Sequence, residues 1–262
     1  MSKGKYYFSK SLEKGLRILS LFNRDTPVLT QSKIAKTLGL NMTSTYRYIN
    51  TLVELGYLEK NAKTKEIRPA LLSLVLSTNL MRATDHLEMI EEVVDRVHRE
   101  NNISIDVAFV VDDALVRIYH REAEETLTYR LPDVARNCLH NTALGKAYLA
   151  GLPAEQVAEK VASLELLERT PKTITDRKKL LREIAITRKR QFSTCEEEYL
   201  PGLLAIGAPL YDSSEGKAIG AVSFDFSVLQ QTVSEIVETY APLIRETARD
   251  ISALLPREKG TR

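Results

Sequence analysis

A short helix, a glycine turn and a second helix follow one another between Thr30 and Gly56, and this order constrains the fold more than any other feature of the chain. Thr30 can cap the start of a helix, and Gly39 can adopt the left-handed conformation that ends one. Asn41 then begins a helix predicted to run to about Leu55. Two short helices joined by such a turn are typical of a helix-turn-helix, whose second helix enters the major groove of DNA.

The helix predicted over residues 42–55 has two different faces at about 100° per residue. One face is mostly apolar and is predicted to be buried: Met42, Thr45, Tyr46, Ile49, Leu52 and Val53. The opposite face is rich in hydroxyl groups: it carries Ser44, Arg47 and Thr51, and it is flanked by Thr43 and Tyr48. Small hydroxyl side chains let a helix lie deep in the groove, and an arginine can reach a phosphate or a guanine edge. We therefore predict that this second face contacts DNA, although an ordinary solvated face remains the alternative.

Two strand patterns after Gly56, separated by a polar turn at 61–65, predict a β-wing. Its basic side chains would follow the DNA backbone and supply salt-dependent affinity: Lys60, Lys63, Lys65 and Arg68. Residues 1–70 carry 13 Lys and Arg against 5 Asp and Glu, whereas residues 71–262 carry 24 against 30. This asymmetry favours a DNA-binding module joined to a module of different function.

The chain is predicted to comprise a winged helix-turn-helix domain at 1–70, a linker helix at 71–84 and a second domain at 85–262. The apolar segment at 71–81 is too short to span a membrane and is expected to be a buried helix. Strand patterns occur at 105–111, 115–121, 127–131, 203–211 and 218–226. Helix patterns occur at 85–100, 143–150, 154–164, 177–190 and 228–255. This order predicts an α+β fold, in which an antiparallel sheet carries helices on its faces.

Seven segments in the same order resemble the IclR family of bacterial transcriptional regulators, over about residues 6–255. In the first domain the resemblance rests on SLEKGLRIL at 11–19, STYRYI at 44–49 and LVELGYL at 52–58. In the second it rests on HNTALGKA at 140–147, TPKTIT at 170–175, Glu197-Glu198 followed by Gly202, and AIGAP at 205–209. The resemblance implies a GAF-like effector-binding domain. It also implies dimers through the DNA-binding domains, and often tetramers through the sensor domains.

The resemblance further implies an effector pocket at the start of the helix after His140. Carried over position by position, the pocket residues are Thr142, Ala143, Leu144, Gly145, Cys195, Ala205, Ser223 and Asp225. The residues themselves support an anion site, because the free N–H groups of a helix N-terminus attract negative charge. The family often has Asp at the position of Cys195 and a small hydroxyl residue at that of Asp225. The expected effector is a small organic acid from a catabolic pathway. An aromatic acid is one candidate, because Tyr119, Phe224 and Phe226 lie near the predicted sheet, although they fit the core equally well.

Other interpretations of these residues stay open. His140 is favoured as a structural histidine, Cys195 fits core as well as pocket, and Asp225 could cap a following helix at Ser227 or Val228. The sequence lacks common nucleotide-binding and hydrolase motifs, and a thiol–imidazole pair of Cys195 with His140 has no local support. We therefore expect no catalytic residue, cofactor or metal.

Two classes of alternative function also remain open. The second domain could serve only to oligomerise, or could have weak enzymatic activity. Two distant cysteines, Cys138 and Cys195, and the absence of a signal peptide favour a reducing, cytoplasmic compartment.

Overall fold

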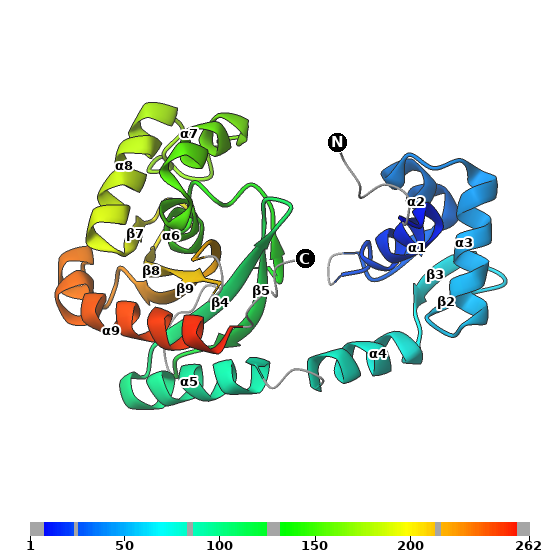
Figure 1. The fold of residues 1–262 in the computed structure, drawn as a ribbon, viewed down its shortest axis with the longest axis horizontal. Coiled ribbons are helices and arrows are strands. Elements are labelled where there is room, and N and C mark those ends of the chain that lie inside the picture. The colour runs from blue at the N-terminus through cyan, green and yellow to red at the C-terminus, as the bar shows by residue number, and fades with distance from the viewer. Residues whose placement is uncertain (1–7, 24–25, 83–85, 125–131, 213–215, 256–262) are drawn as a thin grey trace. The chain divides into compact units, whose positions relative to one another are not determined.

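The computed structural model describes residues 8–23, 26–82, 86–124, 132–212 and 216–255. The chain divides into two compact units, Met1–Asp85 and His86–Arg262 (Figure 1). Among the described residues, no helix has the length and apolar character needed to cross a membrane.

The first unit combines helices with a three-stranded antiparallel sheet of order β1-β3-β2. Its elements are α1 (Lys10–Leu19), β1 (Leu29–Thr30), α2 (Gln31–Leu38), α3 (Met42–Glu54), β2 (Leu58–Lys60), β3 (Glu66–Pro69) and α4 (Leu71–Arg82). The predicted caps are present: Thr30 accepts a hydrogen bond from Lys33 N, and Asn41 accepts one from Ser44 N. The first helix is capped in the same way, because the Ser9 side chain accepts a hydrogen bond from Leu12 N.

Two expectations about burial in this unit are wrong. Met42 and Tyr46 are 48% and 49% exposed, although the helical pattern places them on the core side of α3. The core accommodates a narrower stripe of that helix, made of Thr45, Ile49 and Leu52. The segment expected as a buried helix is α4, and Leu71 in it is 73% exposed because little of the described chain covers this helix.

The second unit is built on a six-stranded antiparallel sheet of order β6-β5-β4-β9-β8-β7. The strands are β4 (Ser104–Val111), β5 (Ala114–Arg121), β6 (Val134–Ala135), β7 (Ser193–Glu196), β8 (Leu203–Tyr211) and β9 (Ala218–Ser227). Four of them match predicted strands closely, whereas β6 and β7 were not predicted. The strand predicted at 127–131 lies outside the described residues.

Helices cover both faces of this sheet. Because both units combine helices with an antiparallel sheet, the predicted α+β fold is confirmed. The helices are α5 (His86–Asn101), α6 (Ala143–Gly151), α7 (Ala154–Ser163), α8 (Arg177–Arg190) and α9 (Val233–Leu254). Alternation along β4 separates the faces: Ile105 belongs to the core shared with α5 and α9, and Ala108 to the core around α6. The last helix starts later than predicted, because Thr232 and Glu235 form a capping box in front of Val233.

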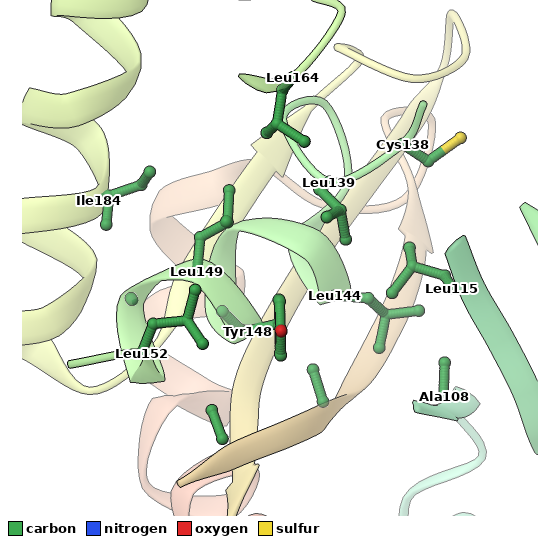
Figure 2. Close-up of a cluster of buried hydrophobic side chains, with 14 of the residues drawn as sticks. Ala108, Leu115, Cys138, Leu139, Leu144, Tyr148, Leu149, Leu152, Leu164 and Ile184 are labelled. Carbon is green, nitrogen blue, oxygen red and sulfur yellow. The ribbon is translucent and has the colours of Figure 1, made fainter. Parts of the chain in front are cut away.

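The centre of the second unit is α6, in which every residue from 143 to 150 is buried. Figure 2 shows Leu144 directed toward Leu115, while Leu149 lies on the side of α8 with Ile184. A helix enclosed by a sheet and a second helix can accept only small or apolar side chains without a partner. The position of α6 determines which residues line the site described below.

Candidate nucleic-acid interface and ligand pocket

The outer face of α3 is open to solvent at most of the predicted DNA-contacting residues. Thr43, Arg47 and Thr51 are exposed, and Ser44 is half-buried next to the cap. Tyr48 is different, because it packs partly against the core of the unit, although the sequence placed it on the flank of the DNA-facing surface. An exposed arginine among small hydroxyl residues is chemically suited to phosphates and base edges.

The wing between β2 and β3 presents four basic residues in different environments. Lys63 and Lys65 are exposed, whereas Lys60 is half-buried with its Nζ 5.4 Å from the centre of the Tyr46 ring. Arg68 donates a hydrogen bond to Glu59 on the neighbouring strand, so part of its charge is already neutralised. Lys65 donates a hydrogen bond to Ala62 O at 2.6 Å, but neither Lys63 nor Lys65 pairs with a carboxylate of a described residue. These two lysines are therefore better suited than Arg68 to a DNA phosphate.

Seven of the eight predicted effector residues line a single pocket beside the start of α6. We call it the α6 pocket, and its lining consists of Thr142, Ala143, Leu144, Cys195, Tyr199, Leu203, Ala205, Ser223 and Asp225. Tyr199 and Leu203 were not predicted. The free space amounts to about 10 Å³, roughly the volume needed for the centre of one water molecule. The pocket is therefore closed in this conformation.

Gly145, the eighth predicted residue, has a packing role. A Cβ atom at this position would lie 2.3 Å from the Cα of Leu139, so only glycine permits this approach. The sequence predicted that its N–H would be free to bind an anion. In the structure this N–H instead donates to the Thr142 hydroxyl at 3.0 Å. An anion at this helix start would meet fewer unpaired N–H groups than expected.

Asp225 contributes a carboxyl group to the α6 pocket and does not cap a helix, because α9 begins well after it. Ser223 donates a hydrogen bond to its Oδ1 at 3.1 Å. Burial and the nearby carboxyl of Asp106 raise the pKa of Asp225 well above its ordinary value. Asp225 can therefore hold a proton under conditions in which an ordinary aspartate is charged.

The polar cluster behind Asp225 was missed from the sequence. Asp106 is fully buried, with its Oδ1 3.1 Å from His120 Nδ1 and 3.6 Å from Arg117 Nη1. The pairing of β4 with β9 places Asp106 opposite Ser223. A charged residue inside the apolar strand pattern at 104–111 was the available signal, because an aspartate on a buried strand requires partners.

Cys195 and His140 have local structural partners. Cys195 Sγ donates to Asn141 O at 3.2 Å, and burial raises the pKa of this thiol to about 12. A protonated thiol is a poor nucleophile. His140 is buried with Nε2 3.0 Å from Leu167 O, as expected for a structural histidine.

The resemblance segments around 146 and 198 meet in a buried ion pair. Lys146 of α6 is 1% exposed and donates to Glu198, which follows β7. Burial raises the pKa of Glu198, while the charge of Lys146 acts in the opposite direction. This pair connects α6 to the segment that carries Tyr199 into the pocket wall.

Comparison with known proteins agrees with these features. The chain matches the family model "Bacterial transcriptional regulator IclR C-terminal" over residues 78–253 and "IclR helix-turn-helix domain" over residues 11–62. It is 25% identical over 248 residues to the Pca regulon regulatory protein of Pseudomonas putida, covering 93% of this chain and 83% of that protein. It is 26% identical over 247 residues to the transcriptional repressor AllR of Klebsiella pneumoniae, covering 94% and 90%.

Among solved structures, an IclR homologue from Microbacterium hydrocarbonoxydans in complex with 4-hydroxybenzoate has the same fold. Its TM-score is 0.70 at 24% identity, with 94% of this chain and 98% of that chain covered. Because the two family models together match most of the sequence, this chain belongs to the IclR family of bacterial transcriptional regulators.

Proposed function

We propose that this protein binds operator DNA through α3 and the wing, and that a small organic acid in the α6 pocket changes its DNA affinity. The observation that carries the ligand part is the α6 pocket itself, to which α6, β7, β8 and β9 all contribute. The relatives named for regulation of the Pca regulon and for repression support a regulatory role. The neighbour solved with 4-hydroxybenzoate supports a small organic acid as the ligand class.

DNA binding is proposed to involve two copies of the chain. Exposed apolar residues in the first unit, including Leu12 and Leu16 of α1 and Leu74 of α4, offer a surface that a second copy could cover. A symmetric dimer would direct two α3 helices at the two halves of a pseudo-palindromic operator. Tetramers through the second units remain part of the proposal.

An acidic ligand is compatible with Asp225 because the raised pKa of this carboxyl group favours its protonated form. A protonated carboxyl group can donate a hydrogen bond to a ligand carboxylate, whereas an ionised one would repel it. The small free volume of the α6 pocket means that binding must favour a more open conformation. A ligand that binds one conformation better than the other shifts their populations and can thereby alter DNA affinity.

The two parts of the proposal can be tested with Arg47→Ala. We expect at least about a tenfold loss of affinity for a duplex selected from random DNA, since a base or phosphate contact is worth roughly 1–3 kcal/mol. Thermal-shift titrations with aliphatic and aromatic acids should give the same response in Arg47→Ala and in the unmodified protein.

Lys178→Ala, which removes an exposed charge from α8, is the control and should keep DNA affinity. Loss of both DNA binding and the ligand response in Arg47→Ala would show that Arg47 is structural. If no acid stabilises the unmodified protein, the proposed ligand class is wrong and the second unit serves another purpose, such as oligomerisation.

A further inference from the structure

A second cleft lies at the other end of α6, where α8, β8 and α9 approach one another. It has about 410 Å³ of free volume, within the range of roughly 300–1,000 Å³ that is typical of small-molecule sites. We call it the arginine cleft, because Arg188, Arg245 and Arg249 all line it. It shares no lining residue with the α6 pocket.

The cleft exists because β7 is shorter than β8. The pairing of β7 with β8 ends at Ser193 and Gly207, so the part of β8 from Ala208 to Tyr211 continues without β7 beside it. α9 packs on β8, while α6 packs on both β8 and α8 (Figure 1). Side chains from α8 and α9 therefore meet around the uncovered edge of β8.

The three arginines bring positive charge that the described part of the chain does not neutralise. No carboxylate of a described residue lies within 4.0 Å of their guanidinium nitrogens, whereas Arg190 on the same helix α8 pairs with Glu183 at 3.0 Å. Arg188 is held in place by donating to the carbonyl oxygens of Ala150 and Leu152. An arginine has five N–H donors, so donors remain available to a ligand.

A buried hydroxyl group in the cleft wall is an independent indication of a ligand. Thr187 lines the cleft and is 1% exposed, and its Oγ1 has no hydrogen-bond partner among the described residues. Buried hydroxyl groups normally have partners, because desolvation without a hydrogen bond is unfavourable. Tyr211 and Ser252 add further polar atoms to the same wall.

We propose that the arginine cleft binds a small anion carrying at least two negative charges, such as a di- or tricarboxylate or a phosphorylated metabolite. The planar guanidinium group matches both carboxylate and phosphate geometry, and three such groups favour a multivalent ligand. This site is separate from the proposed effector site, because no residue lines both the arginine cleft and the α6 pocket.

The test uses the full-length protein with citrate and inorganic phosphate as separate probes, each compared with sodium chloride at equal ionic strength. We expect saturable binding by calorimetry and an increase in Tm with at least one probe. Arg249→Ala should weaken this binding about tenfold, since Arg249 is exposed and its removal breaks no ion pair with any residue that the structure describes. Comparing the two probes distinguishes a carboxylate from a phosphate ligand.

Lys189→Ala is the matched control, because it removes one exposed positive charge from α8 without lining the cleft. Its anion affinity should equal that of the unmodified protein. Equal effects of Lys189→Ala and Arg249→Ala, or stabilisation by chloride alone, would overturn the proposal. So would the absence of saturable binding by both probes, which would leave the arginines with the role of preventing the open β8 edge from pairing with another strand.

Discussion

The helices α3 and α6 begin in the same way but lie in opposite environments. Asn41 and Thr142 each cap their helix by accepting a hydrogen bond from a backbone N–H three residues later. α3 buries one stripe and exposes its hydroxyl-rich side, whereas α6 is buried from residue 143 to residue 150. Local sequence therefore starts both helices, and the surrounding structure decides what their polar residues do.

The basic residues of the two helices illustrate the consequence. Arg47 on α3 is exposed and remains available to a partner outside the chain. Lys146 on α6 is buried, and its charge is satisfied internally by Glu198. A change on α3 should therefore affect binding, whereas a change on or around α6 should affect folding.

The largest effect is expected from Gly145→Val. The added side chain would overlap the backbone of Leu139, which cannot move away as a flexible side chain could. We expect destabilisation of at least about 3 kcal/mol, measured by urea denaturation. Gly15→Ala in α1 is the control, because a Cβ there meets nothing within 4 Å and should stabilise the helix by about 0.5–1 kcal/mol. A cost below about 1 kcal/mol for Gly145→Val would contradict the close packing of α6.

The next effect is expected from Lys146→Met, which leaves Glu198 buried without its counter-ion. Removing one partner of a buried pair costs about 3–5 kcal/mol, whereas Arg47→Met on exposed α3 should change stability by no more than about 0.5 kcal/mol. Equal stability changes in the two variants would remove the distinction between these helices.

The cost of Lys146→Met should also depend on pH. Burial already raises the pKa of Glu198, and loss of the Lys146 charge raises it further. When the pKa of a carboxyl group is higher in the folded than in the unfolded protein, its contribution to the free energy of unfolding is fully present below the unfolded pKa. That contribution is lost as pH rises through the folded pKa. The variant should therefore lose more stability at pH 8 than at pH 5, and adding Glu198→Gln should abolish that difference.

The smallest of the three effects is expected from Asp225→Asn, which changes a half-buried residue of the α6 pocket. Burial and Asp106 raise the pKa of Asp225, so its contribution to stability falls as pH rises from about 4, the ordinary pKa of aspartate, through the raised value. Relative to the unmodified protein, the Asn variant should gain of the order of 1 kcal/mol between pH 5 and pH 8. Parallel Tm curves over this range would show that Asp225 titrates normally.

Sequence reasoning succeeded where structure depends on near neighbours. The strand at 203–211 and the helix at 177–190 were predicted with their observed bounds, because strong patterns and clear boundary residues define them. It failed at β6 and β7, two and four residues long, because such short strands are defined by their pairing partners. It also failed for Tyr46, because the helical period does not reveal how wide a stripe the core accepts.

The sequence by itself determined the caps at Thr30 and Asn41 and the hydroxyl-rich face of α3, since these depend on residues within a few positions of one another. Only the tertiary structure decided that Asp106 and Arg117 lie behind Asp225, and that arginines of α8 and α9 share a cleft. The physical reason is that strand register and helix packing join residues far apart in the chain. No local periodicity specifies which buried charge meets which partner.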